Sequence, residues 1–181
     1  MFWIDDADAI YRTLELWDAS DDWPNGLSIR AVILGGGAVA FYGVSRHRTT
    51  ADLDLWLDVE QLSTGLATQA EVLGLSFRAS AVAWVAEGWE RRIRWSSRHF
   101  KHLRFGWFDP YDWIITKLGR WVGHDMDDAL AVVRGQQLDP PTLHDRVRQA
   151  LPDYIGNERN VRMAWHDLVD AMGWASDFRM L

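Results

Sequence analysis

The chain has 181 residues, of which 48% are hydrophobic and 25% charged, and its formal net charge is −7. This length suits one sizeable core, while the acidic charge disfavours broad binding to duplex DNA, which depends on many lysines and arginines. The chain has no cysteine, which excludes disulfides, thiolate zinc sites and a cysteine nucleophile. The sequence shows no signal-peptide pattern and no apolar run approaching about eighteen residues, so we expect a soluble cytoplasmic protein without membrane contact.

The first part of the chain predicts helices and short strands in turn. Residues 5–20 space apolar side chains at helical intervals, with acids near the start, which predicts an amphipathic helix. Branched residues in 28–36, bounded by glycine, predict a buried strand, and a short helix ending at Gly43 follows. Polar and apolar residues alternate in 51–58, the pattern of a strand with one buried face.

The rest of the chain predicts two further strands and then helices. Residues 59–74 predict a helix, Ser80 could cap another through about Glu87, and 91–97 and 102–109 predict two strands that are antiparallel neighbours. The helical pattern after these strands covers 110–123, 124–135, the stretch after Pro140–Pro141 and a last helix from about Asn157.

This order of elements predicts an α+β fold, with a small mixed sheet flanked by helices and a helical C-terminal subregion. No linker rich in glycine, serine or proline divides the chain. We therefore expect a single domain over 1–181, with a sheet-bearing core in 1–109 and a helical subregion in 110–181.

Three consecutive glycines, at 35–37, follow the first predicted strand. Their pattern, G-x-G-x-x-A, matches a dinucleotide-binding turn, but that interpretation requires repeated βαβ units and a differently placed acid. A second interpretation is that the glycines only let a helix pack close to a strand. A third is that a glycine turn opening a helix presents free N–H groups and a positive dipole end to a phosphate chain.

Asp52 and Asp54 lie two residues apart in a predicted strand, so their side chains point to one face with Cα atoms roughly 6 to 7 Å apart. Carboxylates so placed can bind two magnesium ions about 3.5 to 4 Å apart, one activating an acceptor hydroxyl and the other holding nucleotide phosphates. The ordinary alternative is a solvated strand face, because D-x-D occurs widely. The neighbouring glycine turn favours the metal site.

Together these residues resemble the nucleotidyltransferases of the DNA polymerase beta superfamily. They look most similar to small bacterial proteins related to the abortive-infection (AbiEii-like) toxin nucleotidyltransferases of toxin–antitoxin systems. The pattern of that family is carried here by Gly35, Gly36, Ala38, Gly43, Arg48, Thr50, Asp52 and Asp54. The resemblance implies a polymerase-beta-type fold and two Mg²⁺ ions as cofactors. It also implies catalytic and metal-binding roles for Asp52 and Asp54, and nucleotide binding by Gly35, Gly36, Arg48 and Thr50.

A second block resembles the same family. Its members often follow the sheet with a helical lysine, then an arginine and an aspartate pair, and this chain has Lys117, Arg120, Asp125 and Asp128 at matching intervals. By the family's logic Lys117 would face the triphosphate as a catalytic residue, and Asp125 or Asp128 would organise that lysine or an acceptor. The alternative is a lysine and aspartates on exposed helix faces.

One departure from the family concerns a third metal-binding carboxylate, which the superfamily usually carries on a later strand. The sequence has arginine and serine there, and Glu90 and Asp109 are the weak candidates that remain. If neither reaches the metals, the resemblance implies a degenerate enzyme.

Residues 90–105 concentrate arginines in an otherwise acidic chain. On one interpretation Arg92 and Arg94 share a strand face with the carboxylates and contact nucleotide phosphates or a single-stranded RNA end. On the other, these arginines solvate edge strands and discourage aggregation. The histidines form no H-E-x-x-H and no serine lies in G-x-S-x-G, which disfavours zinc catalysis and the α/β-hydrolase mechanism.

The predicted function is transfer of a nucleoside monophosphate from a nucleoside triphosphate (NTP) to a hydroxyl acceptor, with release of pyrophosphate. The sequence leaves the acceptor open among tRNA, a protein hydroxyl and an antibiotic-like small molecule. The resemblance implies a toxin role and a cognate antitoxin as partner. The alternative from another class is a catalytically silent module that binds a protein partner and no magnesium-dependent nucleotide. Dinucleotide binding, a third hypothesis, predicts affinity for NAD without magnesium.

Overall fold

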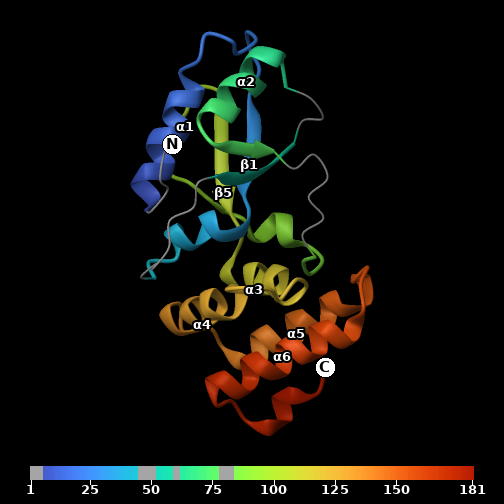
Figure 1. Ribbon diagram of the computed structural model, residues 1–181. Helices are drawn as coiled ribbons and strands as arrows, with labels where there is room; N and C mark the ends of the chain where they lie inside the picture. The colour runs from blue at the N-terminus through green and yellow to red at the C-terminus, as the bar shows by residue number, and fades with distance from the viewer. Residues whose placement is uncertain (1–5, 45–51, 59–61, 78–83) are drawn as a thin grey trace. The chain divides into compact units, whose positions relative to one another are not determined.

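The computed structural model describes residues 6–44, 52–58, 62–77 and 84–181 (Figure 1). They cluster into two compact units. The first unit holds the described residues of 1–41, 46–81 and 93–108, and the second those of 42–45, 82–92 and 109–181. The expectation of a single domain over 1–181 stays a prediction.

The first unit contains a five-stranded mixed sheet. Its strands are β1 (Ile29–Ile33), β2 (Leu53–Leu57), β3 (Leu75–Phe77), β4 (Arg94–Trp95) and β5 (Leu103–Trp107), in the order β3-β2-β1-β5-β4. β1 is antiparallel to β2 and parallel to β5, and β2 is parallel to β3. β4 and β5 are antiparallel neighbours, as the sequence predicted. The predicted α+β class is confirmed.

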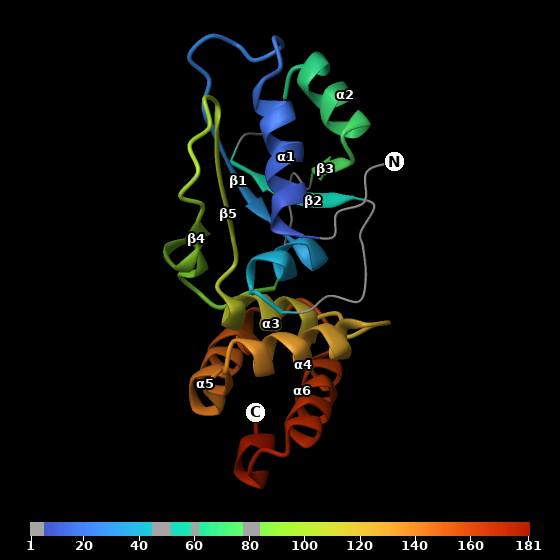
Figure 2. The ribbon, with the colours of Figure 1, turned by 90° about the vertical axis from the view of Figure 1, so that its left-hand side faces the viewer.

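Two helices of the first unit, α1 (Ala7–Asp18) and α2 (Thr64–Val72), pack against one face of this sheet, and Figure 2 shows α1 lying along it. The Trp17 indole is fully buried, donates a hydrogen bond to the Leu66 carbonyl in α2 at 3.1 Å, and packs its ring 5.4 Å from that of Phe77 on β3. One tryptophan thus joins both helices to the sheet. The hydrophobic effect of burying so large a ring is a main source of stability in this layer.

The short helix predicted after the glycines is a 3₁₀ helix, η1 (Gly35–Phe41). It packs on the helix-covered face of the sheet, so closely that a Cβ at Gly37 would collide with Leu53 Cδ1. At Gly37, therefore, glycine is needed for close packing of a helix on a strand, as one of the sequence interpretations proposed. Phe41, at the end of η1, stacks on Trp107 with ring centroids 4.1 Å apart.

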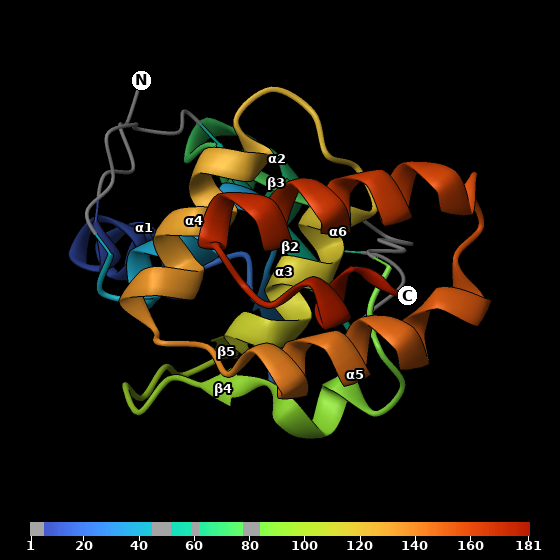
Figure 3. The same ribbon diagram turned by 90° about the horizontal axis from the view of Figure 1, so that it is seen from below.

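The second unit is helical. Its α-helices are α3 (Pro110–Leu118), α4 (Asp125–Gly135), α5 (Pro140–Ala150) and α6 (Glu158–Met172), with 3₁₀ helices η2 (Trp89–Arg92), η3 (Leu151–Asp153) and η4 (Ser176–Arg179). α3 contacts the other three α-helices, which surround it in Figure 3, and its Trp113, Ile114 and Ile115 are fully buried. None of the helices in the described ranges is long and apolar enough to cross a membrane.

The segment before β4 differs from the sequence prediction. Of the helix expected from Ser80 to Glu87, residues 80–83 lie outside the described residues and 84–87 are not helical. The Arg92 guanidinium donates hydrogen bonds to the carbonyls of Ala86 and Glu87, which holds this backbone in an irregular path. The strand expected over 91–97 is reduced to β4, because η2 extends to Arg92.

Two further differences lie near β2. Of the helix expected over 59–74, residues 59–61 lie outside the described residues. α2 begins after Ser63, which caps it by accepting from the Leu66 N–H. The strand β3 was not predicted. It has three residues, too few for an alternating pattern to appear.

Candidate functional site

The structure brings Asp54 and the glycine turn together in the first unit. The Leu34 N–H donates to the Asp54 carbonyl at 2.8 Å and extends the pairing of β1 with β2 by one residue. Gly35 follows with φ of +54°, in the left-handed region that favours glycine. A Cβ at Gly35 would lie 3.4 Å from Asp54 Oδ2, so the turn backbone is in van der Waals reach of the carboxylate.

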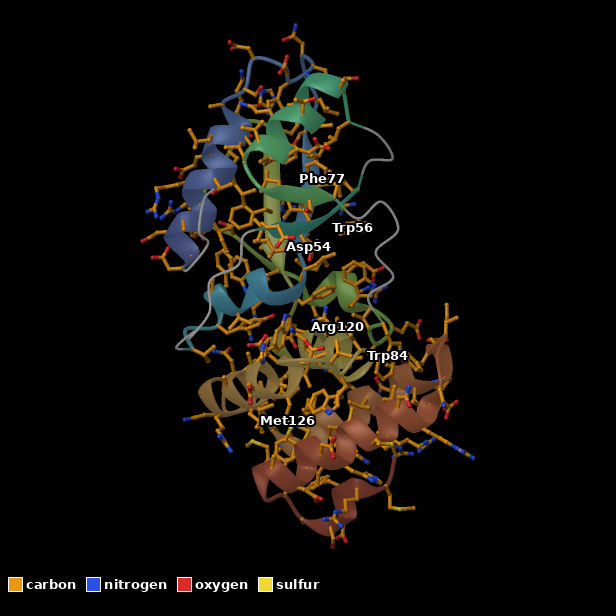
Figure 4. All side chains as sticks on the ribbon, viewed as in Figure 1. Asp54, Trp56, Phe77, Trp84, Arg120 and Met126 are labelled. Atoms are coloured by element: carbon orange, nitrogen blue, oxygen red, sulfur yellow. The ribbon has the colours of Figure 1, made fainter. Side chains whose placement is uncertain are left out.

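The alternation of β2 gives Asp54 a defined face. Leu53, Leu55 and Leu57 are buried toward the helices, whereas Asp54 and Trp56, labelled in Figure 4, are half-buried and point to the opposite face. We call this second face the Asp54 face. Asp52 lies directly before β2 and is exposed.

Strand pairing identifies the neighbours of Asp54 on its face. Asp54 is in register with Ser76 on β3, so a hydroxyl side chain lies beside it across the strands. Further along the same face, Arg30 on β1 forms an exposed ion pair with Asp58, with 2.7 Å between Arg30 Nε and Asp58 Oδ2. Asp58 thus pairs with an arginine. Among the described residues, Asp54 has the carboxylate that comes within 4 Å of a Cβ added at Gly35.

A third carboxylate on the Asp54 face is not supplied by β5. Register with β1 places Arg104 and Gly106 on this face. A Cβ at Gly106 would lie 2.7 Å from both the Arg94 carbonyl oxygen and Ile93 Cγ2, so the space for a side chain is already filled. Among the residues in described positions, no group of three or more histidine, aspartate and glutamate side chains is arranged to hold a metal ion.

The two weak candidates for the third carboxylate belong to the second unit. Glu90 lies in η2 and is exposed. Asp109 caps α3 by accepting from the Tyr111 N–H, and its Oδ1 also accepts from Arg146 Nη1 at 2.7 Å. A metal-binding role for either residue stays a prediction.

Asp52 and Asp54 are chemically suited to magnesium. Mg²⁺ prefers oxygen ligands, keeps several waters, and is often bound by one or two carboxylates together with substrate phosphates. Asp54 beside the glycine turn, with Asp52 two residues before it in the chain, would provide such a partial ligand set. Arg48 and Thr50, the two other nucleotide-binding candidates of this block, lie outside the described residues.

The second block forms an ion-pair cluster in the second unit. Lys117, in the last turn of α3, donates to Asp125 Oδ1 at 2.9 Å and to Asp128 Oδ2 at 3.3 Å. Arg120 donates to both oxygens of Asp125, from Nε at 2.9 Å and from Nη2 at 2.6 Å. All four residues singled out in the sequence are therefore in one cluster, which joins the end of α3 to the start of α4.

Asp125 is the centre of this cluster. It is 3% exposed, as is Lys117, and its Oδ2 also accepts from the Val122 N–H at 3.0 Å. Burial raises the pKa of Asp125, but hydrogen bonds from Arg120, Val122 and Lys117 outweigh it and hold that pKa below its ordinary value of 3.8. The ammonium of Lys117 also lies 4.9 Å from the ring centre of Trp113.

A comparison with family models identifies the family of the chain. The model described as "Nucleotidyltransferase of unknown function (DUF6036)" matches residues 15–172 of the 181. The chain belongs to this nucleotidyltransferase family. The matched range includes the glycine turn, Asp52, Asp54 and the Lys117 cluster. Searches of the curated proteins and of the solved structures found no match.

Most arginines of 90–105 interact with other residues of the chain. Arg92 makes a bidentate ion pair with the fully buried Asp112, at 2.7 and 2.9 Å, and this hydrogen bonding raises the pKa of Arg92 above its ordinary value despite burial. Arg98 pairs with Asp8 and Glu15 on α1. The basic segment therefore largely stabilises the fold.

Strand register corrects the expectation that Arg92 and Arg94 share a face with the carboxylates. Arg94 is paired with Trp107, which is in register with Ile33 on the helix-covered face, opposite to Asp54. Arg92 lies in η2, outside the sheet. The interpretation that both share a strand face with the carboxylates is wrong.

The sequence analysis did not single out Trp56, which the structure places on the Asp54 face. The same alternation that placed Asp52 and Asp54 on one face extends to Trp56, so the signal was present in the sequence. It also missed the partner of Arg92. Asp112 lies twenty residues away on α3, and no local pattern connects the two.

Proposed function

We propose that the protein transfers a nucleoside monophosphate from an NTP to a hydroxyl acceptor, at a magnesium site formed by Asp52 and Asp54. The acceptor oxygen bonds to the α-phosphorus, the bond from that phosphorus to the pyrophosphate breaks, and the hydroxyl proton is released. The observation that carries this proposal is how closely the glycine turn approaches Asp54. A Cβ added at Gly35 would lie 3.4 Å from Asp54 Oδ2. Membership of a nucleotidyltransferase family supports the reaction class.

The proposed roles follow from the chemistry of each group. Asp52 and Asp54 would hold the expected two ions through their carboxylate oxygens. Bound magnesium neutralises phosphate charge and favours ionisation of the acceptor hydroxyl. Gly35 and Gly36 would bind phosphate through their backbone N–H groups, because the turn lies close to Asp54 and so to the ions that Asp54 would hold.

Other residues keep supporting roles in the proposal. Lys117 and Arg48 are candidate charge stabilisers, and Thr50 would support the turn. Asp125 and Asp128 would orient Lys117, which the short contacts in the second unit make chemically reasonable. Arg120 shares Asp125 with that lysine. An acceptor on tRNA or protein stays a prediction, and a toxin role and an antitoxin partner are predictions from the resemblance.

Calorimetric titration of the four ribonucleoside triphosphates, with and without magnesium, tests the proposal. The Asp54→Asn variant keeps the shape of the side chain and the backbone bond to Leu34, and removes the charge. Asp58→Asn is the matched control, because Asp58 lies on the same strand face but pairs with Arg30. We expect magnesium-dependent binding in the wild type and the control, and its loss in Asp54→Asn. Equal binding in all three proteins would refute the metal site.

A second candidate function is a catalytically degenerate module that binds a protein partner. The observation that favours it is the absence of a carboxylate from the described β5 positions of the Asp54 face, where Arg104 and Gly106 lie. This candidate predicts that the folded wild-type protein binds none of the four triphosphates with magnesium. The same titration therefore separates the two functions.

A further inference from the structure

Trp56 is an aromatic side chain on the same strand and face as Asp54. It lies two residues further along β2, so the two Cα atoms are roughly 6 to 7 Å apart. Its side chain is half-buried, whereas Leu55 and Leu57 on the other face are buried among the helices. A large ring thus stands beside the proposed metal site and keeps part of its surface accessible.

The next two positions across the sheet from Trp56, on β1 and β5, are apolar. Its partner in register on β1 is Val32, and the next position across the sheet is Gly106 on β5. Neither side chain has a hydrogen-bonding group. Recognition at this position would therefore depend on shape and stacking, which an indole ring provides.

Trp95 on β4, which is in register with Gly106, has a packing role. An added Cβ at Gly106 would lie 3.0 Å from Trp95 Cε3, so the Trp95 ring covers the glycine. The Arg104 guanidinium lies over the same ring, 4.6 Å from its centre. Trp95 is therefore held between β5 and an arginine, and its position on the same face, separated from β2 by β1 and β5, makes it a matched control.

We propose that Trp56 is the stacking platform for the base of the nucleotide whose phosphates bind at Asp54 and Gly35. The proposal rests on the proposed function. In a nucleotide one ribose separates the phosphates from the base, and a side chain two residues along the strand is at a suitable distance from Asp54. Aromatic side chains stack on bases of every kind, with a strength that depends on the overlapping ring area.

Because the indole ring is bicyclic, stacking on Trp56 should favour purine nucleoside triphosphates. A purine overlaps more of the Trp56 ring than a pyrimidine does, so ATP and GTP should bind more tightly than CTP and UTP. Since the neighbouring Val32 and Gly106 side chains offer no hydrogen bond, we expect little discrimination between ATP and GTP.

The test compares ATP with inorganic tripolyphosphate, each titrated with magnesium into the wild type, Trp56→Leu, Trp56→Phe and Trp95→Leu. Tripolyphosphate has the phosphates and no base. Leucine keeps apolar bulk but removes the ring face, and phenylalanine restores an aromatic face. We expect Trp56→Leu to weaken ATP binding by about tenfold to a hundredfold with tripolyphosphate binding unchanged, and Trp56→Phe to recover most of the loss.

Unchanged tripolyphosphate binding also shows that the variant is folded at the phosphate site. The proposal is overturned if Trp56→Leu binds ATP as the wild type does, if its ATP and tripolyphosphate affinities fall together, or if Trp95→Leu gives the same selective loss. If this inference alone fails, the wild type still binds ATP, and that binding still depends on magnesium and on Asp54. A wild type that binds neither ligand with magnesium refutes the proposed function as well.

Discussion

At the scale of single residues, Asp125 shows how one carboxylate organises a buried cluster. It accepts from Lys117 Nζ, from the Arg120 guanidinium and from the Val122 N–H, and it is almost fully buried. Removing one partner of such a cluster leaves a buried charge uncompensated, which costs more than the net contribution of the pair itself. Substitution of Asp125 therefore tests whether this ion-pair cluster stabilises the second unit.

We predict that Asp125→Asn lowers the free energy of unfolding at neutral pH by about 3 kcal/mol, because the Lys117 ammonium then keeps only Asp128 as a charged partner. Denaturant unfolding followed by circular dichroism measures this. Asp127→Asn is the control, since the Asp127 side chain is 78% exposed, and its effect should be within error. Equal stability of the two variants would contradict a structural role for Asp125.

The pH dependence of this effect has a definite sign. The pKa of Asp125 in the folded protein is below its ordinary value of 3.8, so its stabilisation is fully present above 3.8 and is lost as the pH falls through the folded value. The difference in unfolding free energy between wild type and Asp125→Asn should therefore narrow at pH values below 3.8. Denaturant titrations at a series of acidic pH values measure it, and a constant difference would argue against ionised Asp125 as the cause.

Neighbourhoods of residues could be predicted where spacing or the family resemblance indicated them, and not where they depend on a tertiary contact. Alternation within β2 predicted the face of Asp54, and the family resemblance grouped Lys117 with Asp125. The partner of Arg92 is Asp112, and their pairing depends on how η2 packs on α3. No local pattern contains that information.

At the scale of elements, the turn between β1 and η1 makes the proposed site, and Gly35 is its test. An alanine there adopts φ of +54° against its preference and adds a Cβ 3.4 Å from Asp54 Oδ2. We predict that Gly35→Ala loses about 1 to 2 kcal/mol of stability and also weakens magnesium-dependent nucleotide binding.

The matched control for this substitution is Gly26→Ala. Gly26 also has a positive φ, of +77°, but an added Cβ would meet nothing within 4 Å. It should lose similar stability in denaturant unfolding and keep nucleotide binding in calorimetry. If both variants bind the nucleotide like the wild type, the glycine turn is a packing feature only.

The elements that the sequence predicted best are those with a clear period. α1, β2 and α6 follow from helical or alternating spacing, and Asn157 was correctly expected at the start of the last helix, where it caps α6. β3 is too short for a period to show, and the face of Arg94 depends on its register with β5. Register is set by pairing between distant segments, so spacing within β4 cannot determine it.

At the scale of the whole molecule, the two units have different kinds of charged site. The first has the Asp54 carboxylate beside a glycine turn, and the second has a cluster of two cations and two carboxylates centred on the buried Lys117 and Asp125. The family match, over 15–172, includes both. Composition does not mark the division between the units, because no glycine-, serine- or proline-rich linker separates them in the sequence. The division follows from the contacts of the folded chain.

The central claim is that Asp54 holds a metal ion together with nucleotide phosphates, and electron paramagnetic resonance with Mn²⁺ in place of Mg²⁺ tests it most directly. Free Mn²⁺ is titrated with the wild type, Asp54→Asn and Asp58→Asn, each with and without ATP. We predict a nucleotide-dependent loss of the free-ion signal, beyond that caused by ATP alone, in the wild type and Asp58→Asn, and none in Asp54→Asn. An Asp54→Asn protein that binds Mn²⁺ and ATP as tightly as the wild type would contradict the claim.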